Sequence, residues 1–504
     1  MYKNDSVDKA TYDKLYDVGS SPGKFYGLVK VHKDGYPIRP VVSMVATPEH
    51  GIAKWLDDFI KPNIPDSYML KSTDEFVNVV KSHPVQSGDH LVSYDVKSLY
   101  TNVPRKETID VVTKYVYSKD SLCKPPIPEK IFKKLLLLVT EGNFLFNGEF
   151  YKQIDGLAMG GPVGPSLANF FLAHLERTKI ANCPSEIRPK LYLRYVDDIF
   201  ALLCVNQSYE DFFHFINRLH PNLEFTVEVA TTSLPFLDVE VKLREDSVQL
   251  SVFRKKTNTN VILNFAAAAP NKWKAGLIFC FLHRARKICS SADIFSREVH
   301  LLRDLFRENG YPIKFFEKVF EKFQQRISSP PQDDEASDDE DTRPYILKLP
   351  FVQNESAAFA KKLQNILLQK LGVQIKVVYK SCKLSSFFSL KDRTPLSLSS
   401  NVVYLFACSR DVNTTYIGET TRPLAVRVKE HLSLGKKLTA VGTHIKNCDG
   451  CKNHNFTLDN FEVLKRCPTA GATRINEALL IRRHSPLINK QLYLSGASFM
   501  LTVY

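Results

Sequence analysis

Short runs of apolar, β-branched and aromatic residues predict strands in the first half of the chain. One run, Leu91–Tyr94, predicts a buried strand with Asp95 at its end. Two further runs within Lys190–Leu203 flank a pair of adjacent acids. This arrangement predicts a hairpin with Asp197 and Asp198 at its tip.

Helical and mixed patterns follow in the second half. Residues 270–327 have helical periodicity, and a strand–helix–strand order is expected over 345–352, 355–371 and 374–379. Further on, 403–406 and 416–418 suggest two neighbouring strands. A helix is expected over 421–431, and a further segment of interest covers 472–489.

The three aspartates at the predicted strand ends are the first candidates for chemistry. An isolated Asp-Asp pair is most often an ordinary acidic turn. A strand-end Asp95 together with Asp197 and Asp198 can instead hold two Mg²⁺ ions, which prefer oxygen ligands. In two-metal nucleotidyl transfer, one ion activates the attacking 3′-hydroxyl and the other stabilises the leaving oxygen.

The length and composition of the chain fit a protein of several domains that binds a polyanion. The 504 residues are enough for about three domains, and 44% hydrophobic residues allow sizeable cores. The net charge of +14 suits nucleic acid. No apolar run reaches the roughly 18 residues of a membrane span, and no signal peptide is recognised at the N-terminus. Ten scattered cysteines do not resemble a disulfide framework, so a reducing compartment is expected.

The predicted strands belong to a series of motifs that resembles the reverse transcriptases of Penelope-like retroelements, which are related to telomerase. The resemblance covers residues 22 to 325 and rests, beside the aspartate segments, on Phe25–Lys33, Ile38–Ser43, Gln153–Asn169, Leu234–Val241 and Phe253–Asn260. It implies an α+β multidomain chain with the fingers, palm and thumb of a right-hand polymerase. Because the first motif begins at Phe25, less sequence precedes the fingers than is usual in this group, which leaves a truncated copy as one alternative.

The resemblance also implies roles for individual residues. It assigns the two Mg²⁺ ions to Asp95, Val96, Asp197 and Asp198. A bulky ring at Tyr100 would exclude a 2′-hydroxyl and so select deoxynucleotides. The remaining predicted contacts to nucleotide, primer or template are Lys30, Lys33, Arg39, Gln153, Gly160, Pro162 and Asn169. Of these, Lys30, Lys33 and Arg39 flank a probable Asp34-Gly35 turn and can neutralise a triphosphate.

Residues 400–504 resemble a GIY-YIG endonuclease, which is fused behind the polymerase in Penelope-like elements. Val402-Val403-Tyr404 departs from the usual first triplet but keeps the tyrosine. The resemblance implies that Glu477 binds one Mg²⁺ ion and that Arg427 stabilises charge on the phosphate. The other expected catalytic residues are Tyr404 or Tyr416 for the attacking water, His431 as a proton carrier and Asn489 for positioning.

A cysteine and histidine cluster lies within the same segment. Cys448 and Cys451 have the spacing of a zinc knuckle. A structural Zn²⁺ held by Cys448, Cys451, His454 and either His444 or Cys408 is one alternative. The other is that these cysteines are free thiols on a loop and that His444 belongs to the nuclease site.

These expectations combine into a retrotransposon protein that copies RNA into DNA and nicks target DNA to prime synthesis. Its partners would be an RNA template, target DNA, RNA/DNA hybrid and deoxynucleoside triphosphates, and its compartment the nucleus. The expected domains are a reverse transcriptase (1–327, with fingers and palm over 22–265 and thumb over 266–327), an acidic linker (328–343), a βαβ-like connector (344–399) and the nuclease (400–504). Two alternatives remain: a decayed or domesticated RNA- or DNA-binding protein, and a polymerase without a nuclease that uses pre-existing 3′ ends.

Overall fold

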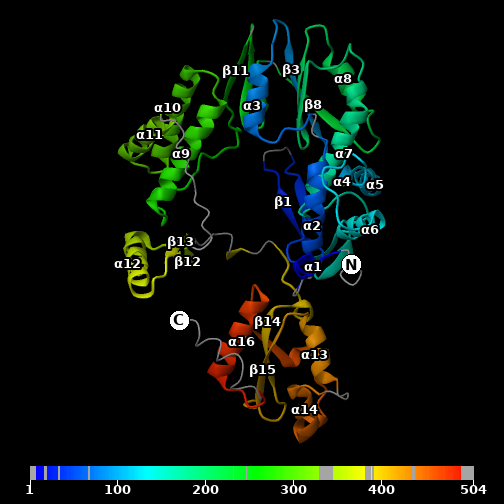
Figure 1. The fold of residues 1–504 in the computed structure, drawn as a ribbon, viewed down its shortest axis with the longest axis vertical. Helices are drawn as coiled ribbons and strands as arrows, with labels where there is room; N and C mark the ends of the chain where they lie inside the picture. Colours follow the sequence, from blue (N-terminus) through cyan, green and yellow to red (C-terminus); the bar gives the residue numbers. More distant parts are fainter. Residues whose placement is uncertain are drawn as a thin grey trace. The chain divides into compact units, whose positions relative to one another are not determined.

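The computed structural model describes most of the chain as a mixed α/β protein (Figure 1). The described residues are 7–15, 20–31, 35–65, 68–230, 232–245, 247–328, 344–380, 387–388, 391–433 and 438–489. The predicted acidic linker and Lys33 therefore lie outside the described residues, apart from Ser328. Two compact units form: one contains Met1–Pro65, Ser98–Arg177 and Leu390–Tyr504, and the other Asp66–Lys97 and Thr178–Ser389. Among the helices described, none combines the length and apolar character that a membrane crossing needs.

A four-stranded antiparallel sheet carries the predicted aspartates. Its order is β6-β7-β3-β8, with β6 at Leu191–Tyr195, β7 at Asp198–Leu203, β3 at His90–Val96 and β8 at Phe225–Val229. Both predicted strand regions are therefore confirmed. On β3, Leu91 packs toward α3 (Thr73–Ser82), whereas Tyr94 packs against Phe212 of α8 (Tyr209–Ile216). Because side chains alternate along a strand, the two helices cover opposite faces of this sheet.

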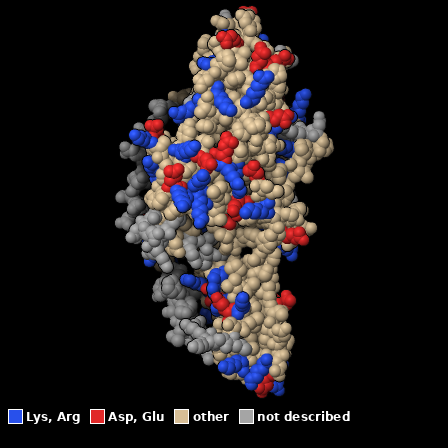
Figure 2. All heavy atoms as spheres, turned by 90° about the vertical axis from the view of Figure 1, so that its right-hand side faces the viewer, with Lys and Arg blue, Asp and Glu red and all other residues tan. Residues whose placement is uncertain are grey.

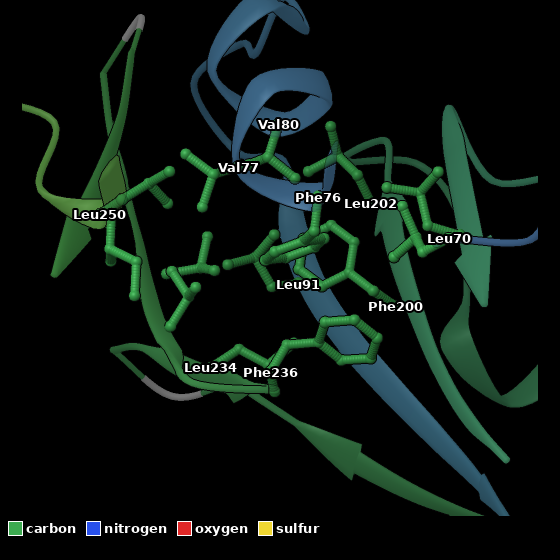
Figure 3. Close-up of a cluster of buried hydrophobic side chains, with 14 of the residues drawn as sticks. Leu70, Phe76, Val77, Val80, Leu91, Phe200, Leu202, Leu234, Phe236 and Leu250 are labelled. Atoms are coloured by element: carbon green, nitrogen blue, oxygen red, sulfur yellow. The ribbon is translucent and has the colours of Figure 1, made fainter. Parts of the chain in front are cut away.

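A second sheet closes the same core. Its order is β11-β10-β9, with β11 at Ser247–Val252, β10 at Val239–Arg244 and β9 at Leu234–Phe236. Figure 3 shows Phe76 of α3 among Phe200 of β7, Phe236 of β9 and the surrounding leucines and valines. The Phe76 ring centroid lies 5.0 Å from that of Phe200 and 4.8 Å from that of Phe236. These contacts anchor the aspartate-bearing strand β7 in a dry core.

Three helices form a bundle at the end of this core. They are α9 (Asn271–Ile288), α10 (Ala292–Glu308) and α11 (Ile313–Ser328), so the helical pattern predicted over 270–327 is confirmed. The bundle has its own core around Phe306, Phe316 and Phe323. The side chain of Ser291 accepts a hydrogen bond from the N–H of Ile294 at 3.3 Å, which caps the start of α10.

The N-terminal segment of the first unit is built on a four-stranded sheet of order β2-β1-β4-β5. The strands are β1 (Gly23–Val29), β2 (Ile38–Ser43), β4 (Asn143–Phe146) and β5 (Glu149–Lys152), and only the β1–β4 pairing is parallel. The helices of this segment are α1 (Lys9–Leu15), α2 (His50–Ile60), α4 (Leu99–Asn102), α5 (Arg105–Val116), α6 (Glu129–Val139) and α7 (Gly164–Thr178). Helix α2 packs on α6 and α5, which buries Leu56, Ile60 and Leu136.

A small strand–helix–strand element follows the described end of the helix bundle. Strands β12 (Tyr345–Pro350) and β13 (Ile375–Lys380) pair in parallel, with α12 (Gln353–Leu371) between them in sequence. The two strands and the helix predicted here are present, with ends shifted by one or two residues.

The C-terminal segment is built on a three-stranded antiparallel sheet of order β15-β14-β16. The strands are β14 (Val402–Ala407), β15 (Thr415–Thr420) and β16 (Phe461–Arg466). Its helices are α13 (Leu424–Leu432), α14 (Ala440–Asn447), α15 (Asp449–Lys452) and α16 (Ala470–His484). The core contains Val402, Tyr404 and Phe406 of β14 together with Val428 of α13 and Phe461 of β16.

Candidate active sites

Two aspartates face each other at the end of the β6-β7-β3-β8 sheet. Asp95 of β3 is the direct register partner of Asp198 of β7. Opposed residues in antiparallel strands have Cα atoms about 4.5–5.5 Å apart. By alternation, Asp95 shares a face with Leu91, and Asp198 shares a face with Phe200, so both carboxylates emerge on the α3 side. Like charges at opposed positions destabilise a sheet, and a bound cation would remove this cost.

Asp197 lies in the two-residue turn between β6 and β7. The turn pairs Tyr195 with Asp198 and places Val196 at a φ of 57°. A β-branched residue in the left-handed region is strained, so the surrounding structure must hold it there. Part of that hold is a hydrogen bond from the N–H of Val96 to the carbonyl of Asp197 at 3.1 Å.

Arg194 is the other support of this turn. It is fully buried, and its Nη1 donates to the carbonyl of Val196 at 2.9 Å. Its backbone is fixed on the other side, because its N–H bonds to the carbonyl of Tyr68 at 2.8 Å and its carbonyl accepts from Leu70 at 2.7 Å. The positively charged guanidinium thus contacts the turn that contains Asp197 and leads directly to Asp198.

The predicted nucleotide-binding residues Lys30, Arg39 and Gln153 lie in two places on the β2-β1-β4-β5 sheet and its flanks. Lys30 and Arg39 flank the β1–β2 hairpin, where Arg39 is exposed and the N–H of Lys30 bonds to the carbonyl of Pro37 at 2.9 Å. Gln153 follows β5, and its Nε2 donates to the carbonyl of Asp155 at 2.8 Å.

The other predicted residues of this site lie in or near a glycine loop before α7 and on α7 itself. Gly160 has a φ of 114°, and a Cβ there would lie 2.4 Å from the carbonyl oxygen of Val42. Only glycine fits this close approach. The half-buried Pro162 follows in the same loop, and a Cβ on Gly164 would lie 3.8 Å from the ring of Tyr100. Asn169 is half-buried on α7 itself.

The C-terminal segment gathers two tyrosines, an arginine and a histidine into one network, here called the tyrosine cluster: Tyr404, Tyr416, Arg427 and His431. Nε of Arg427 donates to the hydroxyl of Tyr404 at 3.2 Å, and this hydroxyl lies 2.7 Å from Nε2 of His431. Burial, reinforced by Tyr416, raises the pKa of Tyr404. Burial, reinforced by Arg427, lowers the pKa of His431 to about 4, so its imidazole is neutral at pH 7.

The tautomer of His431 follows from its partners. Arg427 can only donate, so the hydroxyl proton of Tyr404 is available for Nε2 of His431. Nδ1 then carries the ring proton and donates to Oγ1 of Thr439, which lies 2.7 Å away. Thr439 also caps α14, because its Oγ1 accepts from the N–H of Gly442 at 3.1 Å. Sequence patterns did not single out Thr439.

Glu477 on α16 lies near the tyrosine cluster. Burial, reinforced by the neighbouring Glu419, raises the pKa of Glu477 to about 7. Glu419 is half-buried on β15, and one of its carboxylate oxygens is buried without a hydrogen-bond partner. Two adjacent carboxylates, one holding an unpaired oxygen, fit a divalent cation by their donor chemistry. The sequence argument missed Glu419, although it directly follows the Tyr416–Gly418 motif.

Asn489 and Gly418 shape β15. Oδ1 of Asn489 accepts from the N–H of Ile417 at 2.9 Å, and its Nδ2 donates to the carbonyl of Ile417 at 2.7 Å. Asn489 therefore clamps the strand residue between Tyr416 and Gly418. A Cβ on Gly418 would lie 2.6 Å from Cε1 of Tyr416 and 2.7 Å from the hydroxyl of Tyr404.

Three cysteines and one histidine lie close together at the C-terminal end of β14. Within the described residues, they are the one group of at least three His, Cys, Asp or Glu side chains with all ligand atoms within 4.8 Å of one another: Cys408, His444, Cys448 and Cys451. Sγ of Cys408 lies 3.7 Å from Sγ of Cys448 and 3.4 Å from Sγ of Cys451, which in turn lies 3.5 Å from Nε2 of His444. Tetrahedral Zn²⁺ with bonds of about 2.3 Å to sulfur holds sulfurs about 3.8 Å apart.

The composition of this cluster differs from the predicted set in one member. Both Cys408 and His444 join Cys448 and Cys451, whereas His454 lies outside the group and its ring packs on Phe456 at 4.5 Å between centroids. Burial lowers the pKa of His444, and the backbone N–H of Cys451 lowers the pKa of Cys448. Neutral imidazole and thiolate are the ligand forms that Zn²⁺ requires.

Comparisons with known proteins bear on the first of these sites. Residues 31–227 match the family model described as reverse transcriptase (RNA-dependent DNA polymerase), and residues 261–321 match a model described as animal helix-turn-helix domain. No curated protein matches the chain.

Solved structures with similar folds include telomerase from Candida albicans in complex with a fragment of telomeric RNA. The identity is 9%, the match covers 61% of this chain and 60% of that chain, and the TM-score is 0.43. Telomerase from Candida tropicalis is 14% identical over 61% of this chain and 59% of that chain, with a TM-score of 0.35. The Sicinivirus RNA-dependent RNA polymerase is 12% identical over 64% of this chain and 71% of that chain, with a TM-score of 0.40.

The chain thus spans about 60% of the length of the telomerases it resembles. The family match begins within the β1–β2 hairpin and ends in β8, so it includes Asp95, Asp197 and Asp198. Residues 31–227 of this chain are therefore similar to reverse transcriptase domains.

Proposed function

We propose that this chain is an RNA-directed DNA polymerase of a Penelope-like retroelement. The observation that carries the proposal is the register pairing of Asp95 with Asp198, beside Asp197 in the turn, within a reverse transcriptase domain. Mg²⁺ at these carboxylates would supply charge stabilisation for the attacking 3′-oxygen and the leaving pyrophosphate. The strained turn and the buried Arg194 hold two of the three acids in place before substrate arrives.

Primer extension on an RNA template with Mg²⁺ and deoxynucleotides tests this function. Asp197→Asn keeps the shape of the side chain but removes its charge. We expect extension to fall at least about a hundredfold, because a lost metal ligand forfeits several kcal/mol of charge stabilisation. Asp120→Asn, on an exposed turn, is the matched control. Equal extension by wild type and Asp197→Asn would defeat the proposal, and retained RNA binding without any extension by wild type would favour a binding protein.

We further propose that the C-terminal segment is a GIY-YIG-like endonuclease that nicks target DNA and so provides the primer. Its support is the network of Tyr404, His431 and Arg427 near the half-buried Glu477. Tyr404 would orient the attacking water through its oxygen, since its own proton is engaged by His431. Arg427 would stabilise charge on the phosphate. Mg²⁺ bound through Glu477 would supply Lewis-acid chemistry at the leaving oxygen.

Nicking of supercoiled plasmid by the full chain tests the nuclease. We expect Glu477→Gln to abolish nicking, while the matched change Glu462→Gln at an exposed position of β16 leaves it intact. Equal nicking by wild type and Glu477→Gln would refute the nuclease and favour a polymerase that uses pre-existing 3′ ends.

A structural Zn²⁺ ion is the third part of the proposal. The cluster of Cys408, His444, Cys448 and Cys451 fits a tetrahedral site by ligand type and spacing. Metal analysis of the purified chain should give one Zn²⁺ per chain, lost in Cys448→Ser and kept in Cys467→Ser. The absence of Zn²⁺ from wild type would remove this site.

The proposed domain organisation follows the sequence motifs. It has a reverse transcriptase over 1–327, a linker over 328–343, a connector over 344–399 and the nuclease over 400–504. The partners would be the RNA template, target DNA, RNA/DNA hybrid and deoxynucleotides. Because the target would be chromosomal, the proposed compartment is the nucleus.

A further inference from the structure

The small element formed by β12, α12 and β13 has one covered face. The hydroxyl of Tyr379 on β13 donates to the carbonyl of Ser356 on α12 at 3.1 Å, and Nε2 of Gln364 donates to the carbonyl of Ile375 at 3.0 Å. The half-buried positions of both strands, such as Leu347 and Val377, alternate with exposed ones. Helix α12 therefore packs on one side of the two-stranded sheet.

The other side of these strands, here called the open face, carries a regular pattern. Three register pairs present exposed side chains there, and each pair joins a lysine to an apolar residue: Ile346 with Lys376, Lys348 with Val378, and Pro350 with Lys380. Ile346 is 64% and Val378 37% exposed. The lysines thus alternate between the strands, and a strand spacing of about 4.8 Å with a two-residue rise of about 6.6 Å places diagonal neighbours about 8 Å apart.

Positively charged residues greatly outnumber negatively charged ones in this element. Residues 344–380 contain six lysines and a single acidic residue, Glu355, which lies in the first turn of α12. Among the ion pairs of the described residues, none involves Lys348, Lys376 or Lys380. By contrast, on the face seen in Figure 2, basic and acidic side chains are interspersed. Within the part of the chain that the structure describes, the open face is therefore a local cationic surface whose three lysines form no ion pair.

We propose that the open face binds single-stranded RNA. The six residues of each strand make a surface about 20 Å long, and the three lysine ammonium groups along it match the phosphates of a nucleic-acid strand. Ile346 and Val378 lie between the lysines and can contact sugars and unstacked bases. An unpaired strand exposes its bases for such contacts, whereas a duplex keeps them stacked inside. This surface would hold template RNA outside the polymerase site.

The first test is lysine footprinting on the full chain with an oligo-uridine RNA as the probe. Acylation of each lysine is read by mass spectrometry with and without RNA. We expect RNA to protect the lysines of the open face, Lys348, Lys376 and Lys380. The lysines of α12 should stay reactive and serve as internal controls, namely Lys361, Lys362 and Lys370. Protection of the α12 lysines instead, or of neither set, would overturn the proposal. Equal protection by duplex RNA would overturn the preference for single strands.

The second test uses two charge-matched triple variants of the full chain and the salt dependence of RNA binding. The first set removes the open-face charges through Lys348→Gln, Lys376→Gln and Lys380→Gln. The second removes three charges from the helix through Lys361→Gln, Lys362→Gln and Lys370→Gln. Each phosphate contact on a single strand contributes about 0.7 to the slope of log K against log salt.

We expect the open-face variant to lose about 2 from this slope, and about a hundredfold in affinity near 0.1 M salt. The helix variant should keep the wild-type slope. Equal losses in both variants would mean that only net charge matters, and the open face would then have no specific role. Primer extension on a short template reports separately on the polymerase site.

Discussion

Gly418 gives the sharpest test of how β15 shapes the tyrosine cluster. In Gly418→Ala, the new Cβ would lie 2.6 Å from Cε1 of Tyr416 and 2.7 Å from the hydroxyl of Tyr404. Both distances are far below normal van der Waals contact, so a ring or the strand must move. Tyr404 is fully buried and its hydroxyl contacts both His431 and Arg427, so it has no free space to move into.

Two opposing terms set the size of the effect. Gly→Ala in an extended strand gains about 0.4–1 kcal/mol from the unfolded chain, and Gly418 does not have the positive φ that would prevent this gain. Overpacking a well-filled core costs about 1–3 kcal/mol. The net expectation is a local destabilisation of about 1–2 kcal/mol. Displacing the hydroxyl of Tyr404 should also slow nicking at least about tenfold, the equivalent of one weakened hydrogen bond.

Gly471→Ala is the matched control, because a Cβ on Gly471 in α16 would meet nothing within 4 Å. Amide hydrogen exchange of β14 and β15 in the full chain measures local stability, and plasmid nicking measures the site. Gly418→Ala should exchange faster and nick more slowly, whereas Gly471→Ala should do neither. Wild-type exchange and nicking in Gly418→Ala would refute the packing argument.

Three further predictions concern polar groups that are buried or half-buried. Arg194→Lys should lose the hydrogen bond to the carbonyl of Val196, destabilise the β6–β7 turn by about 1–3 kcal/mol and slow nucleotide incorporation. Amide hydrogen exchange measures the stability of the turn, and primer extension measures incorporation. Wild-type exchange and extension in the variant would contradict this prediction. Thr439→Val should slow plasmid nicking about tenfold, whereas Thr439→Ser should keep the wild-type rate. When His431 is already replaced by alanine, adding Thr439→Val should slow nicking no further. A further loss in that double variant would mean that Thr439 acts through the stability of the fold. The raised pKa of Glu477, about 7 against roughly 4.3 unfolded, means that its carboxyl favours folding at low pH and that this contribution is lost as pH rises through 7. In the absence of metal, the free energy of unfolding of Glu477→Gln, relative to that of wild type, should therefore rise by about 1–2 kcal/mol from pH 5 to pH 8, after allowance for solvent screening. The same stability difference between the two proteins at pH 5 and at pH 8 would contradict this prediction.

Local patterns were enough to locate the strands that carry the aspartates. Leu91–Tyr94 lies within β3 and the acidic pair lies at the β6–β7 turn, because alternation and turn position are properties of short segments. Helix α13 begins at Leu424, three residues later than predicted. Pro423 precedes it in an extended conformation and lacks an N–H, so it ends the preceding loop and starts the helix.

Contacts between distant segments could not be derived in the same way. Only the fold shows that Cys408 and His444 join Cys448 and Cys451, since Cys408 is forty residues away from Cys448 in sequence. The role of Arg194 had a visible signal, because a charged residue within the apolar run of β6 must find buried partners. Thr439 had no such signal, since a threonine before a helix is usually only a cap.

The clamp of Asn489 on Ile417 has a consequence for the order of events during synthesis. The segment that fixes the backbone between Tyr416 and Gly418 is translated about seventy residues after them. Because domains fold largely as they emerge from the ribosome, the aspartate-bearing sheet can form long before this last contact. A nascent chain would then complete its aspartate-bearing sheet before it can complete the tyrosine cluster, so a product that stops before Asn489 would have the first candidate site without the second.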